Sequence, residues 1–176
     1  MKIYRNNVLV EASTVDDLDD NIHRGFPDTK KRQHAAPGVQ LSGITYINYP
    51  FNKALKVDSV ARGENGDYKQ SILFNDVSFE TIASDSTVTI SCSGKLVHLL
   101  PITLADSNVK VSCNCLDFHH RFAYHNHGDE SLYGPKPQPY VRKTNSRPPA
   151  NPMNVSGMCK HLIKLIDTLQ KRNIVD

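Results

Sequence analysis

The sequence predicts an α+β fold: a small antiparallel sheet or sandwich, followed by a module that ends in a helix. Three observations predict this class. Residues 39–109 contain short runs of β-branched and aromatic residues that alternate with turn residues, as in antiparallel sheets. Residues 116–158 hold three Gly and six Pro, a composition that long regular elements do not tolerate. An apolar stripe at helical spacing follows near the C-terminus.

The composition limits the size of the core. The chain has 176 residues, which suits one domain or a domain with an appendage, and its 39% of hydrophobic residues without Trp predicts a modest core. No apolar run is long enough to cross a bilayer, and residues 1–20 lack an apolar leader. We therefore expect no membrane partner and a cytosolic chain, whose thiols stay reduced and more often bind metal than form disulfides.

Charge is unevenly distributed along the chain. The net charge is +3, and residues 110–176 carry ten Lys and Arg against five Asp and Glu. A basic half of this kind can meet nucleic acid or an acidic protein surface. The alternative is an ordinary solvated surface of mixed sign.

The N-terminal part predicts one short helix and an extended arm. Residues 13–24 open with Ser13 or Thr14 as an N-cap, place acids in the first turn and align three apolar residues on one face. Residues 25–38 contain Gly, Pro and the basic triplet 30–32, which indicate an arm or linker. The triplet is either a phosphate contact or an exposed part of that linker.

Six segments then predict strands, two of them joined in a hairpin through Ser93 and Gly94. After them, residues 117–127 allow one short helix, and residues 157–173 predict a long one. The predicted strand segments are 39–50, 54–61, 68–80 (one strand, or two around Asn75 and Asp76), 86–94, 95–104 and 108–115.

Two short cysteine motifs carry the strongest chemical signal. A C-x-C pair, Cys113 and Cys115, ends a predicted strand, and a C-x-H pair, Cys159 and His161, begins the predicted C-terminal helix. Together they supply thiolates and an imidazole, a set suited to tetrahedral Zn²⁺. The alternative is reduced cysteines in a core and a histidine on the helix surface, and we interpret Cys92 in this way, as a strand thiol.

The stretches "CNCLDF" and "CKHLIKLI" resemble the SWIM zinc-binding motif, C-x-C…C-x-H. The resemblance implies Cys113, Cys115, Cys159 and His161 as ligands, with a strand before the first pair and a helix from the second. The 43 residues between Cys115 and Cys159 exceed the usual spacer, so this insert must fold back. One of four histidines in the insert could replace His161 as a ligand: His119, His120, His125 or His127.

A wider resemblance covers about residues 28–165. The stretches 29–49, 68–80 and 132–152 are similar to structural proteins of contractile-tailed bacteriophages. The resemblance implies a virion component of the tail, baseplate or neck, assembled in the host cytoplasm with other virion proteins as partners. The predicted elements and the cysteine motifs divide the chain into 1–38 (helix and basic arm), 39–109 (antiparallel β domain) and 110–176 (zinc-binding SWIM-like module with a Pro-rich insert and a C-terminal helix).

The Pro-rich insert offers candidate contacts for a partner. Its basic and aromatic residues could lie extended against a neighbouring subunit, or grip phosphates and stack bases as the alternative function, a nucleic-acid-binding zinc module. We expect no enzyme, because the thiols are paired at ligand spacing and no P-loop or nucleophile turn is present. The candidate contact residues are Lys136, Tyr140, Arg142, Lys143 and Arg147.

Overall fold

The computed structural model describes residues 2–5, 8–11, 13–26, 38–63, 66–144, 146 and 149–176. Its strands are β1 (Lys2–Arg5), β2 (Val8–Glu11), β3 (Gln40–Tyr49), β4 (Ala54–Gly63), β5 (Gly66–Phe74), β6 (Phe79–Glu80), β7 (Val88–Cys92), β8 (Lys95–Leu99) and β9 (Val109–Cys113). Its helices are α1 (Val15–Gly25), the 3-10 turn η2 (Pro50–Asn52), α3 (Leu116–Arg121), α4 (Ala123–Gly128) and α5 (Lys160–Gln170).

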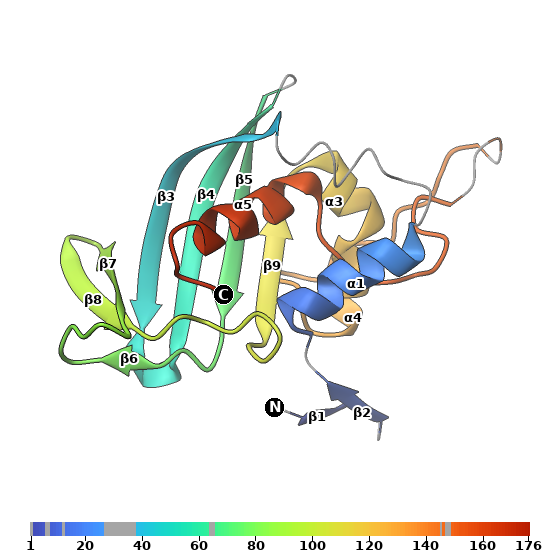
Figure 1. The fold of residues 1–176 in the computed structure, drawn as a ribbon. Coiled ribbons are helices and arrows are strands. Elements are labelled where there is room, and N and C mark those ends of the chain that lie inside the picture. The colour runs from blue at the N-terminus through green and yellow to red at the C-terminus, as the bar shows by residue number, and fades with distance from the viewer. Residues whose placement is uncertain are drawn as a thin grey trace.

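A curled seven-stranded sheet forms the centre of the molecule. Its strand order is β6-β8-β7-β3-β4-β5-β9, and β1 and β2 form a separate hairpin. In Figure 1, α5 crosses one face of the sheet over β5 and β9, while α1, α3 and α4 group beside β9. The α+β class predicted from the sequence is confirmed. None of the described helices is long and apolar enough to span a membrane.

The sheet is mixed, with one parallel pairing in an otherwise antiparallel arrangement. Strands β3 and β7 run parallel and pair at Tyr46 and Cys92, whereas every other neighbouring pair is antiparallel. The predicted hairpin joins β7 to β8, where Ser93 and Gly94 have φ values of 51° and 82°. Positive φ at both turn positions matches the twist of a two-residue hairpin.

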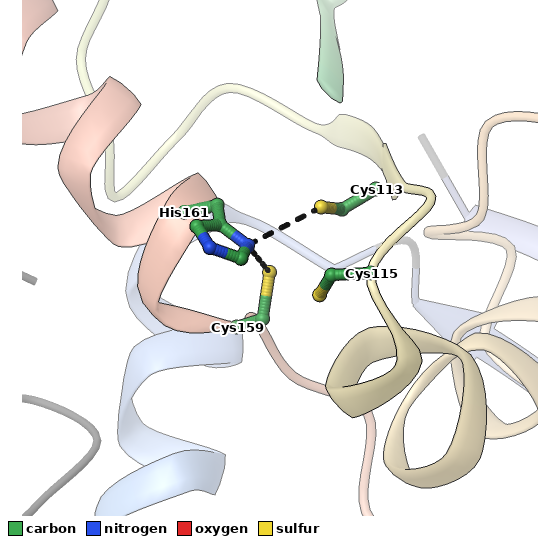
Figure 2. Close-up of side chains that lie close together, drawn as sticks. All are labelled: Cys113, Cys115, Cys159 and His161. Carbon is green, nitrogen blue, oxygen red and sulfur yellow. Dashed lines mark hydrogen bonds between the residues drawn. The ribbon is translucent and has the colours of Figure 1, made fainter. Parts of the chain in front are cut away.

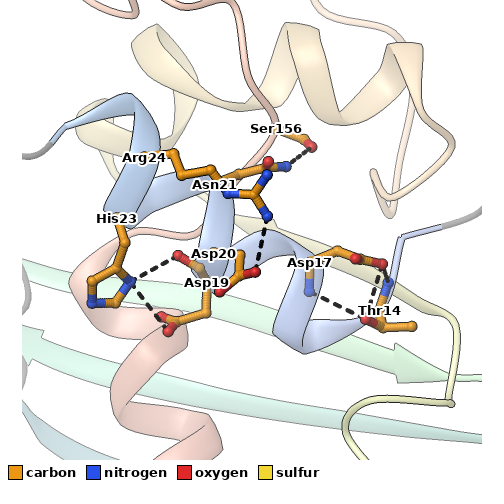
Figure 3. A network of polar contacts seen from close by, with 8 residues as sticks. All are labelled: Thr14, Asp17, Asp19, Asp20, Asn21, His23, Arg24 and Ser156. Atoms are coloured by element: carbon orange, nitrogen blue, oxygen red, sulfur yellow. Dashed lines mark hydrogen bonds and ion pairs between the residues drawn. The ribbon is translucent and has the colours of Figure 1, made fainter.

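Helix α1 begins at a capping box, as Figure 3 shows. The Thr14 hydroxyl accepts a hydrogen bond from the Asp17 backbone N–H at 3.2 Å, and the Asp17 carboxylate accepts one from the Thr14 N–H at 2.9 Å. Of the two predicted caps, Thr14 is therefore the one used. The Asn21 side chain donates to the Ser156 hydroxyl at 3.1 Å, which ties α1 to the segment that precedes α5.

One hydrophobic core joins the segments into which the sequence was divided. Leu18 of α1, Ile72 of β5 and Leu165 of α5 are all fully buried members of the same cluster. Strand β9, at the start of the third segment, forms the end of the central sheet by pairing with β5. The basic triplet at 30–32 lies outside the described residues.

Gly157 packs between Ile22 of α1 and Phe122, the residue that joins α3 to α4. A Cβ atom there would sit 2.9 Å from the ring of Phe122 and 3.0 Å from the side chain of Ile22. These distances are shorter than ordinary van der Waals contact. The absence of a side chain at Gly157 therefore lets the chain pass between α1 and the α3–α4 pair on its way to α5.

The substitution Gly157→Ala should destabilise the fold by about 1–3 kcal/mol, because the added methyl overpacks the contact with Phe122 and Ile22. Urea unfolding measures the change. Gly128→Ala is the matched control, since a Cβ at Gly128 meets nothing within 4 Å. Equal losses in the two variants would contradict the packing argument.

Candidate metal centre

The first pair of candidate ligands lies where β9 turns into α3. Cys113 is the last residue of β9, and its pairing with Gln70 of β5 directs its side chain toward one face of the sheet. Cys115 is the N-cap of α3, and its sulfur accepts a hydrogen bond from the Phe118 N–H at 3.3 Å. Between them, the Asn114 N–H donates to the Lys69 carbonyl at 3.1 Å, which anchors the turn on β5.

The second pair lies in the first turn of α5. Cys159 is the N-cap of the helix, with no side-chain hydrogen bond to its backbone, and His161 follows two residues later. The His161 ring stacks on Tyr68 of β5, with ring centroids 4.6 Å apart and an interplanar angle of 22°. This stack fixes the imidazole against the sheet.

The two pairs converge, as Figure 2 shows. The ligand atoms of Cys113, Cys115, Cys159 and His161 all lie within 4.8 Å of one another, so the group could hold a metal ion. His161 Nδ1 faces the sulfurs of Cys113 at 3.7 Å and Cys159 at 3.8 Å. All four residues are buried, and Cys113, the most exposed of them, has 6% of its surface accessible to solvent. The structure thus brings together the four residues that the two sequence motifs contain.

The histidines of the insert lie elsewhere. His119 and His120 are on α3, and His125 and His127 are on α4. Within the described part of the chain, none of them belongs to the group of candidate ligands. Cys92 is also outside the group; it is buried at the end of β7, as expected for a strand thiol, and burial raises its pKa.

Two buried asparagines fold the insert back. The Asn126 amide donates to the Gly157 carbonyl at 3.1 Å and accepts from the Gly157 N–H at 3.0 Å. Asn151 closes a second turn in the same way, by accepting from the Val155 N–H and donating to its carbonyl. The sequence analysis missed both residues, because an isolated Asn in a helix or loop carries no pattern that distinguishes a buried clamp from a surface side chain.

The thiols interact strongly in this enclosed space. Hydrogen bonds from Cys113 and Cys159 lower the pKa of Cys115. The hydrogen bond to Cys115 raises the pKa of Cys113 to about 12, and burial raises the pKa of Cys159. The surroundings of Cys115 therefore favour its thiolate, whereas those of Cys113 and Cys159 disfavour ionisation. Three thiolates and an imidazole are a donor set that thiophilic metal ions prefer.

The candidate contact residues of the insert have different surroundings. Tyr140 stacks on His120 with ring centroids 3.9 Å apart, and Lys136 Nζ lies 5.7 Å from the centroid of the Tyr124 ring. Lys143 is exposed. Arg142 is half-buried, and its Nε has no hydrogen-bond partner among the described residues, whereas Arg147 lies outside them.

The chain was compared with known protein families, with characterised proteins and with solved structures. None of these comparisons finds a match.

The substitution Asn126→Ala should lower the free energy of unfolding by about 2–3 kcal/mol, because both buried backbone groups of Gly157 lose their partners. The loss should appear in chemical unfolding monitored by circular dichroism. Asn52→Ala, at an exposed position of η2, should stay within about 0.5 kcal/mol of wild type. A loss below about 0.5 kcal/mol at Asn126 would contradict its role as a clamp.

Proposed function

We propose that Cys113, Cys115, Cys159 and His161 bind one Zn²⁺ ion in a closed structural site, and that the protein acts by binding rather than by catalysis. The observation that supports this is the approach of all four ligand atoms to within 4.8 Å of one another in a buried site. Four protein ligands complete a tetrahedral zinc site, whereas catalytic zinc sites keep one position for water or substrate.

Such an ion would stabilise the fold by closing a long loop of the chain. It would link β9 to α5 across the 43 residues between Cys115 and Cys159. The entropic cost of closing a long loop grows only slowly with its length, and metal binding contributes its free energy directly to folding. Zinc would also replace the protons that the raised pKa values of Cys113 and Cys159 favour.

The biological setting is a second part of the proposal. We infer a role as a virion structural component of a contractile-tailed bacteriophage, and its support is the resemblance of three stretches of sequence. The Pro-rich insert fits such a role because it exposes the apolar side chain of Val141 along a segment without regular structure. Exposed apolar side chains of this kind suit contact with a neighbouring subunit.

Nucleic-acid binding is the alternative function, and charge favours it. Lys136 and Lys143 are exposed in a part of the chain where basic residues outnumber acidic ones two to one. One argument against it is that Tyr140, a candidate base-stacking residue, already stacks on His120. The virion role therefore remains our preferred setting.

Protein purified without added metal or a chelating resin should contain one zinc ion per chain by plasma mass spectrometry. Cys115→Ser should lose the ion and, with it, the free energy that metal binding contributes to folding. Because each kcal/mol lost shifts the Tm by about 2–4 °C in a chain of this size, the Tm should fall by about 10 °C or more.

The matched control is Cys92→Ala, which removes a buried thiol outside the cluster. It should retain one zinc ion per chain. Zinc retained in Cys115→Ser, or lost equally in Cys92→Ala, would contradict the assigned ligands.

The virion role and the nucleic-acid-binding role predict different experimental results. A virion component should be found by peptide mass spectrometry in purified, nuclease-treated particles from the producing host. A nucleic-acid module should instead bind single-stranded or duplex DNA or RNA with an affinity that falls steeply with salt, and Lys143→Glu should weaken it. Absence from the particles together with such binding would reverse our preference.

A further inference from the structure

Two buried polar atoms beside the candidate metal site have no hydrogen-bond partner among the described residues. They are Oε1 of Gln70 and Nε2 of His161, and neither makes a hydrogen bond to any described residue. Gln70 is 2% exposed and His161 is 3% exposed. Buried polar groups are nearly always paired, so two orphans at one site call for a physical explanation.

The chemistry of the two atoms is complementary when metal is bound. Nδ1 of His161 faces the sulfurs of Cys113 and Cys159, so Nδ1 is the nitrogen placed to coordinate. A coordinating nitrogen carries no proton, and the ring proton of a neutral imidazole then lies on Nε2. Nε2 is therefore a donor, and the amide oxygen of Gln70 is an acceptor.

The register of the sheet places Gln70 beside the site. Gln70 pairs with Ser59 of β4 on one side and with Cys113 of β9 on the other. Directly paired residues project from the same face, with Cβ atoms about 4.5–5.5 Å apart. Gln70 is therefore the side-chain neighbour of a candidate ligand.

Hydrogen bonding orients the Gln70 amide. Its Nε2 donates to the Ser59 hydroxyl at 2.9 Å, on the side away from Cys113, so Oε1 is the end of the amide left without a partner. Tyr68, two residues earlier on β5, projects from the same face and holds the His161 ring by stacking. Of these two neighbouring residues on one face of β5, Tyr68 thus holds the plane of the imidazole, and Gln70 offers an acceptor without a partner.

We propose that Gln70 is a positioning residue of the metal site, whose Oε1 accepts a hydrogen bond from His161 Nε2–H when Nδ1 binds the ion. This inference rests on the proposed zinc site. The bond would fix the tautomer and the orientation of the imidazole and make Nδ1 a stronger donor to the metal. Metal-ligating histidines usually donate their second ring N–H to such an acceptor, and loss of the acceptor typically weakens metal binding about 10–100-fold.

The test uses the full chain loaded with zinc and labelled with ¹⁵N at histidine. In wild type, the Nε2–H of His161 should give a slowly exchanging proton resonance shifted downfield by hydrogen bonding. Gln70→Leu should move that resonance upfield and weaken zinc binding about 10–100-fold in competition with a chelator. Ser59→Ala, which keeps the Gln70 acceptor but removes the bond that orients its amide, should weaken zinc binding less than Gln70→Leu does.

Gln70→Glu tests the contact even if Gln70→Leu fails to fold. A carboxylate is a stronger acceptor, so the Nε2–H resonance should move further downfield. An unchanged resonance in Gln70→Glu, or unchanged resonance and affinity in Gln70→Leu, would overturn the assignment while leaving the zinc site intact. Failure of the wild-type chain to bind zinc would instead overturn the proposed function itself.

Discussion

Three cysteine sulfurs and one imidazole share a small buried space, and the rest of the structure is arranged around that constraint. One pair of ligands ends β9 and the other begins α5, with 43 residues between them. The insert must therefore leave the sheet and return to it. The Asn126 side chain holds the returning chain through the backbone of Gly157, and the small size of Gly157 lets this segment pass against Phe122. Gly157 lies two residues before Cys159, so these contacts help to set the position at which α5 starts.

Electrostatics explains why such a cluster suits a cation. Buried thiols resist ionisation, and here the pKa of Cys159 is raised by burial while hydrogen bonds lower that of Cys115. A divalent ion would remove the conflict by replacing the remaining protons, which would couple metal binding to folding. The free energy of metal binding would then add to that of the hydrophobic core. The zinc site that we propose would thus link the sheet edge at β9 to the start of α5.

Local patterns predicted much of the fold, and long-range contacts did not emerge from them. The capped helix α1, the hairpin at Ser93 and Gly94 and the amphipathic α5 each follow from neighbouring residues. The candidate ligands were visible because both pairs have ligand spacing. The parallel pairing of β3 with β7, the Asn126 clamp and the place of Gln70 beside Cys113 depend on residues distant in sequence. A single sequence contains no periodicity that reports such pairings.

X-ray absorption at the zinc edge tests the central claim most directly, because it reports the atoms that surround the metal. The account predicts a tetrahedral shell of three sulfurs at about 2.3 Å and one nitrogen at about 2.0 Å. His161→Ala should remove the nitrogen at that distance and leave the sulfurs. A shell dominated by oxygen or nitrogen, or one with a single sulfur, would contradict a closed site formed by Cys113, Cys115, Cys159 and His161.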